Sequence, residues 1–452
     1  MMSKGELMTK SELQKKTVCL VSLGCDKNRV DSERILYKLK QFGFQIIQEP
    51  SEANILILNT CAFIESARKE SIEKILELID YKKGNAEKIF VVGCLPAKSL
   101  SEVKEALPEV DCFLGVHCDD KIIQALADSY GYKLEVSDNT PDVACSRIVS
   151  TPKYTAFLKI ADGCNNKCSY CTIPQIRGKY VSVPMEKLLA EANELVANGA
   201  KELILVAQDV TRYGEDIYKK HKIVELIQEL SKIKGLEWIR LHYCYPEFVK
   251  DDLIKEIANN KKVCKYMDIP IQHIDNKILH AMNRASTYEG VTALINKLRK
   301  YCPDIAIRTS IIVGFPGETK LEFNKLCEFL KNYQLDNVGF FPYSREYDTI
   351  AYGLRKQVPN VRKRHRLKKL VRLQSSIMYS KALLQIGNTM KAICEDFNGE
   401  VYTFRSQYNS PEIDSVIFVN KRDVKGCIHL GEFYNVKITN VVEPFDLRGE
   451  II

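Results

Sequence analysis

The chain has 452 residues, 45% of them hydrophobic, which is too long for one compact core and predicts several domains. No apolar run approaches the roughly 20 residues of a membrane-spanning helix, and residues 1–16 are polar and lysine-rich, unlike a secretory signal. The 66 basic and 58 acidic residues give a formal net charge of +8, which permits an acidic partner such as RNA without requiring one.

The N-terminal region, residues 17–125, alternates apolar strands with helical patterns, which predicts a parallel α/β sheet. The expected strands are 18–23, 54–59 and 89–92, and the expected helices are 31–41 and 65–78. Cys25, Cys61 and Cys94 each follow one of these strands. Because the carboxyl ends of parallel strands meet at one edge of a sheet, the three thiols are expected to converge although they are far apart in the chain.

Residues 126–150 are polar and contain proline, and we interpret them as a linker to a second α/β series at 151–383. The expected strands of this series are 155–160, 203–207, 238–242, 266–269, 305–313 and 338–341. Six β/α units predict a full or partial (β/α)6 barrel that resembles a TIM barrel, with its active site at the carboxyl ends of the strands.

The last part of the second series is a basic helical pattern at 362–372. A solvated helix face is the usual explanation of such a run, and contact with RNA or with the barrel's own acidic surface are the alternatives. Residues 384–452 then change to short strands and turns, which predicts a small antiparallel β-barrel. Its expected strands are 390–394, 401–406, 415–419 and 434–441.

Sixteen cysteines stand out in this composition. We expect the protein to work in the cytoplasm, where thiols stay reduced and clustered cysteines are more often metal ligands or catalytic groups than disulfides. The spacing Cys-x3-Cys-x2-Cys at Cys164, Cys168 and Cys171 lies on the loop after the first strand of the second series. Thiolates suit iron–sulfur clusters. A structural zinc site is the alternative, but zinc usually takes four ligands in two pairs and no matching pair lies nearby.

This motif, with the aromatic Tyr170 before the third cysteine, resembles the signature of the radical S-adenosylmethionine (SAM) superfamily. The resemblance implies a [4Fe–4S] cluster whose open iron binds SAM and whose electron cleaves it to an adenosyl radical. Besides Tyr170, the candidates for binding this cofactor lie at strand ends in the barrel: Gln208, Asp209, Arg308, Ser310 and Gly314. For each of these, a polar strand end or an ordinary strand-to-helix turn is the alternative.

The segment at 22–33, Ser-Leu-Gly-Cys-Asp-Lys-Asn-Arg-Val-Asp-Ser-Glu, resembles with Cys61 and Cys94 the N-terminal domain of the methylthiotransferases. The resemblance covers nearly the whole chain. It implies a second [4Fe–4S] cluster on Cys25, Cys61 and Cys94, a TRAM-like C-terminal barrel, an external electron donor and radical transfer of a methylthio group. Taken alone, three dispersed cysteines are more often buried core thiols, but their shared place at strand ends favours ligands.

The other ten cysteines show no ligand-like grouping, and we expect them to be small apolar fillers. They are Cys19, Cys112, Cys118, Cys145, Cys244, Cys264, Cys302, Cys327, Cys394 and Cys427.

One branch of the methylthiotransferases modifies adenosine in transfer RNA, and the other modifies an aspartate of small-subunit ribosomal protein S-twelve. Lys27 resembles the second branch, because the first usually has methionine there. The segments 207–214, 268–273 and 410–414 also resemble it, although Ser415 stands where a glycine is expected. From residue 387 onward the chain has seven basic and ten acidic residues, which suits a basic protein better than RNA.

The sequence therefore predicts a radical SAM methylthiotransferase that modifies the β-carbon of an aspartate in protein S-twelve, either free or in the small subunit, where ribosomal RNA is a further contact. A transfer RNA adenosine methylthiotransferase is the alternative enzyme. A non-catalytic iron–sulfur electron carrier or scaffold is the alternative from another class, and it leaves the six-unit barrel unexplained.

Overall fold

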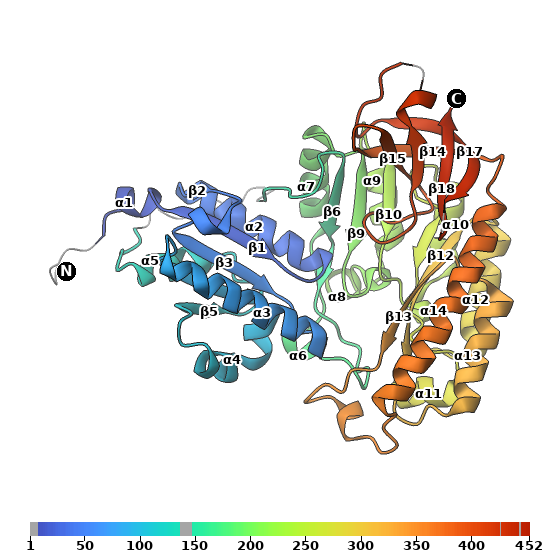
Figure 1. The fold of residues 1–452 in the computed structure, drawn as a ribbon, viewed down its shortest axis with the longest axis horizontal. Coiled ribbons are helices and arrows are strands. Elements are labelled where there is room, and N and C mark those ends of the chain that lie inside the picture. The colour runs from blue at the N-terminus through green and yellow to red at the C-terminus, as the bar shows by residue number, and fades with distance from the viewer. Residues whose placement is uncertain (1–7, 136–146, 425, 443) are drawn as a thin grey trace.

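The computed structural model describes residues 8–135, 147–424, 426–442 and 444–452. Cys145 and part of the expected linker lie outside these ranges. Figure 1 shows an N-terminal α/β domain in blue, a central barrel in green to orange and a C-terminal β-barrel in red. None of the helices in the described ranges has both the length and the apolar character needed to cross a membrane.

The N-terminal domain contains a parallel sheet with the strand order β2-β1-β3-β4-β5, as the alternation of strands and helices predicts. Its strands are β1 Thr17–Ser22, β2 Gln45–Ile46, β3 Ile55–Thr60, β4 Lys88–Gly93 and β5 Cys112–Leu114. Its helices are α1 Lys10–Gln14, α2 Asp26–Phe42, α3 Glu65–Asp80, α4 Cys94–Ala106 and α5 Ile122–Ser129. Side chains of α2 and α5 pack on one face of the sheet, and side chains of α3 and α4 pack on the other.

The central barrel is built from two three-stranded parallel sheets, with the orders β10-β9-β6 and β11-β12-β13. Its strands are β6 Thr155–Lys159, β9 Glu202–Val206, β10 Trp238–Leu241, β11 Tyr266–Asp268, β12 Ala306–Val313 and β13 Asn337–Pro342. A short hairpin pairs β7 Ala161–Asp162 with β8 Val181–Ser182. One isolated backbone bridge in the described ranges, Ile239 with Val263, connects the two sheets, so the six strands form a partial barrel.

Helices surround the strands of the barrel, and most of them share one hydrophobic core with these strands (Figure 1). They are α6 Ile173–Arg177, α7 Met185–Ala197, α8 Glu215–Tyr218, α9 Ile223–Ser231, α10 Asp251–Asn259, α11 Asn276–Ala281, α12 Tyr288–Tyr301, α13 Lys320–Tyr333 and α14 Asn360–Leu383. Short 3-10 helices lie at Pro50–Glu52, Tyr81–Lys83, Val210–Arg212, Pro246–Phe248, Ile350–Gly353 and Lys421–Asp423. The predicted basic run at 362–372 lies within α14, which packs along β13 and α13.

The C-terminal domain is a closed barrel with the order β14-β15-β16-β18-β17. Its strands are β14 Thr389–Phe397, β15 Val401–Ser406, β16 Ile417–Asn420, β17 Phe433–Val442 and β18 Asp446–Ile451. The pairing is antiparallel, as expected, except that β16 and β18 run parallel. The sequence pattern did not predict β18, because its charged Asp446, Arg448 and Glu450 hide the apolar positions that close the barrel.

A buried ion group joins the C-terminal barrel to the central barrel. The Glu202 carboxylate at the start of β9 accepts hydrogen bonds from Arg240 Nε at 2.8 Å and from Arg405 Nη1 at 3.2 Å. All three residues are at most 1% exposed. Burial alone would raise the pKa of Glu202, but the guanidinium groups of Arg405 and Arg240 lower it to about 2.

The change Glu202→Ala should destabilise this junction, because it leaves the buried Arg240 without its anion and removes one of the two carboxylates of Arg405, whose other partner is Glu395 at 2.8 Å. We expect a loss of about 3–5 kcal/mol, the usual cost of breaking a buried ion pair from one side. In the wild type the stabilisation is complete above pH 4.5, the ordinary pKa of glutamate, and is lost as the pH falls toward 2.

Thermal and urea unfolding of the full chain would measure this effect. The matched control is Lys391→Ala, which breaks the half-exposed pair of Lys391 with Glu237 at 2.8 Å and should cost less than about 1 kcal/mol. Equal unfolding midpoints for the two variants would contradict the role of Glu202.

Candidate active site

The three N-terminal cysteines lie at the carboxyl ends of adjacent strands, as the sequence predicts. Cys25 follows β1 and precedes α2, Cys61 follows β3, and Cys94 follows β4 as the first residue of α4. The strands β1, β3 and β4 are neighbours in the sheet, so the three loops meet at one edge. The helix expected at 31–41 begins earlier, at Asp26, because Cys25 already occupies its N-cap position.

Two glycines bring the N-terminal cysteine loops close together. Gly24 has φ +96°, and a Cβ atom there would lie 2.9 Å from the Cβ of Cys61. Gly93 has φ +93°, and a Cβ atom there would lie 2.2 Å from Asn59 Oδ1. Both positions therefore require glycine, for backbone conformation and for space.

Side chains of the 22–33 motif hold these loops in place. Asn28 Nδ2 donates to the carbonyl oxygens of Leu23 at 3.0 Å and Thr60 at 2.9 Å, and Asn28 Oδ1 lies 3.7 Å from Cys94 Sγ. Ser71 Oγ accepts a hydrogen bond from the Cys61 N–H at 3.1 Å. The motif is thus explained by hydrogen bonds that fix the three cysteine loops relative to one another.

The second triad, Cys164, Cys168 and Cys171, lies on the loop between β7 and α6, just after the carboxyl end of β6. Cys164 Sγ accepts a hydrogen bond from the Asn166 N–H at 3.4 Å, and Cys171 Sγ accepts one from the Ile173 N–H at 3.5 Å. Ser169 fixes the loop from the other side, donating its N–H to the Met282 carbonyl at 2.9 Å. Hydrogen bonds to sulfur favour the thiolate form that binds metal.

The donor chemistry of both triads fits iron–sulfur clusters. Burial raises the pKa of Cys94 and of Cys171 to about 12, so each thiolate needs a positive partner in order to form. Among the described side chains, no three of His, Cys, Asp or Glu have a geometry that would hold a single metal ion. The fit to a cluster therefore rests on three free thiols in each group, placed at the carboxyl edge of a parallel sheet.

Helix α6 connects the two triads, because it leaves the Cys164–Cys171 loop and enters the N-terminal domain. Its Ile176 packs into the core of the N-terminal sheet. Its buried Arg177 contacts Asp162 of the barrel at 2.7 Å and Asp31 of α2 at 3.0 Å. Lys159 pairs with the same two carboxylates. Burial would raise the pKa of Asp31, but Lys159 and Arg177 lower it below its ordinary value.

Three of the predicted cofactor-binding residues lie near the second triad, Cys164, Cys168 and Cys171. Tyr170 packs edge-on against Phe315, with ring centroids 6.4 Å apart. Gln208 Nε2 donates to Asp162 at 3.1 Å, whereas its buried Oε1 has no partner among the described atoms. Asp209 also keeps one buried oxygen without such a partner, and burial raises its pKa to about 6 although Thr211 donates to it.

The other three candidates have roles inside the chain. Arg308 Nη1 pairs with Asp414 of the C-terminal domain at 2.6 Å, and Ser310 lies partly buried in β12. Gly314 has φ +75°, its N–H donates to Glu318 at 2.7 Å, and a Cβ atom there would lie 2.4 Å from Lys363 Cγ. Gly314 is therefore required by its packing against α14.

Sequence reasoning missed a polar junction where all three domains meet. His242, at the end of β10, lies 3.5 Å from Asp26 of α2 and 3.0 Å from Ser410 Oγ of the C-terminal domain. Arg29 of α2 forms two hydrogen bonds of 3.0 Å with Glu412. The resemblance at 410–414 was the available signal, but its contacts are long-range and cannot be derived from spacing.

Most of the remaining cysteines are fillers, as expected. Cys19, Cys118, Cys244, Cys264, Cys302, Cys327 and Cys394 are buried and free. Cys112 is half-buried, and Cys427 is exposed in a loop between strands, so that the expectation of a buried filler is wrong there.

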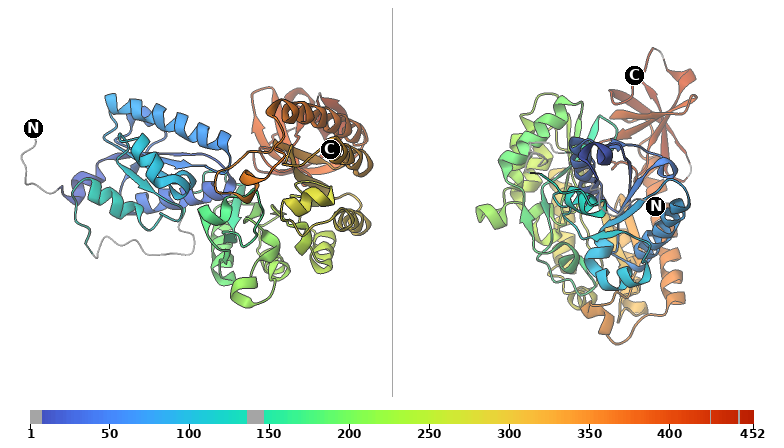
Figure 2. Two further views of the ribbon diagram at one scale, coloured as in Figure 1. Left: turned by 90° about the horizontal axis from the view of Figure 1, so that it is seen from below. Right: turned by 90° about the vertical axis from the view of Figure 1, so that its left-hand side faces the viewer.

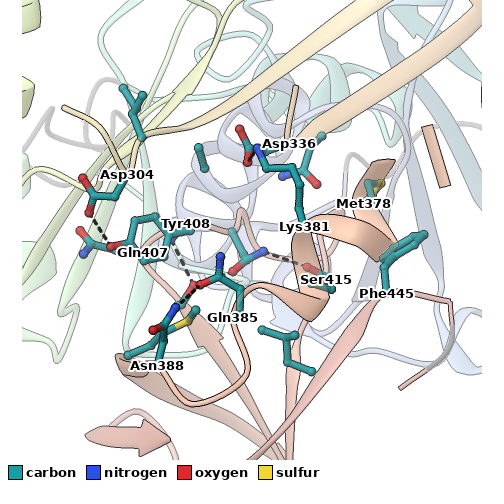
Figure 3. A pocket seen from close by; sticks show the side chains of 18 of the residues that line it. Asp304, Asp336, Met378, Lys381, Gln385, Asn388, Gln407, Tyr408, Ser415 and Phe445 are labelled. Carbon is teal, nitrogen blue, oxygen red and sulfur yellow. Dashed lines mark hydrogen bonds and ion pairs between the residues drawn. The ribbon is translucent and has the colours of Figure 1, made fainter. Parts of the chain in front are cut away.

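A cavity of about 690 Å³ lies away from both triads, between the C-terminal barrel, α14 and the amino ends of β12 and β13. Figure 3 shows its lining, which includes Tyr408 bonded to Asp304 at 2.7 Å and Ser415 bonded to Asn409 at 3.0 Å. Because the triads lie at the carboxyl ends of their strands, this cavity belongs to the opposite end of the barrel.

Three family models match successive parts of the chain. Residues 17–115 match the Uncharacterized protein family UPF0004, residues 158–330 match the Radical SAM superfamily, and residues 386–452 match the TRAM domain.

The curated relatives match over almost the full length. Ribosomal protein uS12 methylthiotransferase RimO of Acetivibrio thermocellus is 45% identical over 452 residues, which cover 97% of this chain and 99% of that relative. The protein of the same name from Clostridium kluyveri is 46% identical over 446 residues, with the same coverage of 97% and 99%.

Solved structures share the arrangement at low sequence identity. The radical S-adenosylmethionine methyltransferase TsrM from Kitasatospora setae has a TM-score of 0.56 and 14% identity, covering 75% of this chain and 74% of that one. The cobalamin-dependent radical enzyme OxsB has a TM-score of 0.52 and 13% identity, covering 81% and 58%. These likenesses concern the fold alone.

Proposed function

Because the chain belongs to the RimO family of ribosomal protein uS12 methylthiotransferases, it acts as a radical SAM methylthiotransferase on uS12, and we propose that its two cysteine triads hold two [4Fe–4S] clusters with different tasks. The observation that supports this division is the path of α6, which ties the loop of one triad to the domain of the other through Arg177.

Cys164, Cys168 and Cys171 are the proposed ligands of the SAM-binding cluster. With SAM bound, such a cluster supplies the electron and the radical chemistry that can remove hydrogen from an unactivated β-carbon. The chain's own contribution is a fixed, buried loop, held by Ser169 and by N–H groups aimed at sulfur. Gln208 and Asp209 each offer a buried oxygen without a partner in the described chain, which suits the polar groups of SAM.

Cys25, Cys61 and Cys94 are the proposed ligands of the second cluster, which when bound would present sulfur or a methylthio group at its open iron. Gly24 and Gly93 allow the loops to approach, and Asn28 and Ser71 fix them through hydrogen bonds. The network around Arg177 keeps the N-terminal domain on the barrel.

The acidic C-terminal barrel is the proposed contact for uS12, since complementary charge steers the encounter with a basic ribosomal protein. The reaction also needs an external electron donor. We place it in the cytoplasm, where the thiols of both triads stay reduced. The names of the relatives favour the ribosomal protein over transfer RNA as the substrate.

A cationic stripe on α14 is a candidate contact for ribosomal RNA. Arg364, Lys368 and Arg372 follow one another at four-residue spacing and are exposed, and none of them forms an ion pair within the described ranges. On the opposite face, Arg366 pairs with Glu318 at 2.5 Å. The stripe is therefore free to neutralise phosphates when the enzyme approaches uS12 in the small subunit.

The double change Arg364→Glu with Lys368→Glu tests this contact. It should slow methylthiolation of uS12 in assembled small subunits by roughly tenfold or more at low salt, and leave free uS12 unaffected, because only the subunit carries RNA. The control is Lys83→Glu with Lys104→Glu on the N-terminal domain, where both lysines are exposed. Equal slowing on free uS12 would contradict an RNA contact.

The change Cys25→Ala tests the division of labour between the triads. It should remove about four irons per chain, keep reductive formation of 5′-deoxyadenosine, and abolish methylthiolation. In contrast, Cys168→Ala should abolish both reactions, because it removes the SAM site. Iron analysis, chromatography of the nucleoside and intact-mass analysis of uS12 provide the three measurements.

The exposed Cys427 supplies the matched control, since Cys427→Ala removes a thiol that belongs to neither triad and should leave all three readouts unchanged. Full methylthiolation by the Cys25→Ala enzyme would rule out the proposed role of the N-terminal triad.

A further inference from the structure

Lys27 is a buried cation beside the N-terminal triad. It lies in the first turn of α2, two positions after Cys25, and is only 6% exposed. Its ammonium lies over the ring of Tyr243, 3.5 Å from the ring centroid, at the end of β10. Lys27 therefore reaches from the N-terminal domain to the carboxyl edge of the barrel.

Within the described ranges no carboxylate forms an ion pair or hydrogen bond with this ammonium, which contacts the ring directly, although Asp26 and Cys25 also favour its charged form through space. Its charged neighbours have partners of their own. Asp26 lies 3.5 Å from His242, Asp31 pairs with Arg177 at 3.0 Å, and Arg29 pairs with Glu412 at 3.0 Å. Burial of a cation without an anion is costly, and a cation–π contact offsets only part of that cost.

The platform under Lys27 is itself strained. Tyr243 has φ +62°, a left-handed conformation that a bulky residue rarely adopts. Its carbonyl oxygen accepts from the Val210 N–H at 3.1 Å, and its own N–H donates to Asp268 at 3.3 Å. Such strain persists where the surroundings hold a residue in place for a functional reason.

The position of Lys27 is also central to the reaction. Tyr245 is two residues beyond Tyr243, and its hydroxyl lies in the electrostatic surroundings of Cys168, Cys164 and Cys171. Lys27 in turn lies within reach of Cys25. Lys27 is therefore next to the loop of Cys25 and is linked through Tyr243 and Tyr245 to the surroundings of the second triad, so an aspartate that reacts with both triads would pass near this ammonium.

We propose that Lys27 binds the carboxylate of the target aspartate and so selects and positions the residue to be modified. This inference rests on the proposed function, since it takes uS12 as the substrate. The ion pair would give the buried ammonium the direct carboxylate partner that it lacks within the described chain. It would also hold the β-carbon at a fixed distance from both triads.

The test compares Lys27→Met and Lys27→Arg with the wild type in the full-length, reconstituted enzyme. The substrates are uS12 and uS12 with the target aspartate replaced by asparagine, which removes the charge and keeps the shape. Binding of both proteins is measured by fluorescence anisotropy in the absence of SAM, and turnover is measured by intact mass.

The wild type should bind the aspartate form roughly tenfold or more tightly than the asparagine form, as expected for a buried charge pair. Lys27→Met should lose this preference while binding the asparagine form as the wild type does, which a double-mutant cycle detects. Lys27→Arg, which keeps the charge, should retain part of the preference.

The control is Lys38→Met, which removes another buried lysine of α2 that already pairs with Asp120 at 3.2 Å and should leave the preference intact. Iron content and circular dichroism show that each variant is folded and loaded. If Lys27→Met weakens both substrates equally, Lys27 is a structural residue and the inference is wrong. If the wild type does not modify uS12 at all, the proposed function fails instead.

Discussion

The structure depends on one buried ion network, in which Arg177 and Lys159 share the carboxylates of Asp31 and Asp162. Asp31 belongs to α2 of the N-terminal domain, and the other three residues belong to the barrel. Because removal of one member would leave buried charges without partners, the network resists separation of the two domains. It ties the N-terminal domain to the barrel, and Figure 2 shows these two parts of the chain side by side.

Both triads follow from the same topological rule, applied in two different sheets. The loops after parallel strands meet at the carboxyl edge, where three loops carry the N-terminal triad and one loop carries the second triad. The two edges could face in different directions if the domains were joined by a flexible linker. Instead, the end of the expected linker is fixed, since Arg147 and Ser150 both bond to Glu33 of α2. These contacts therefore fix the N-terminal domain relative to the barrel.

Local patterns predicted β1, β3 and β4 of the N-terminal sheet, the six parallel strands of the barrel and the place of the cysteines after strands, because these depend on spacing and on hydrophobic period. The short strands β2, β5, β7 and β8 were not predicted, because two or three residues show no period. The patterns missed β18, whose alternating charges conceal its apolar face. They also missed Arg177, His242 and the platform formed by Tyr243. Each of these acts through contacts with residues far away in the chain, which no local period records. In the sequence, Lys27 indicates only the branch of the methylthiotransferases that the chain resembles, and its burial against Tyr243 is visible only in the structure.

The most direct measurement of the domain arrangement is the magnetic coupling between the two reduced clusters, recorded by electron paramagnetic resonance. The wild type should show a coupling with a narrow distribution of distances, because the Arg177 network fixes the domains. The variant Arg177→Met, with its iron content unchanged, should show a weaker and broader coupling, and Arg177→Lys should show an intermediate one. An Arg177→Met enzyme with the wild-type coupling would contradict the account.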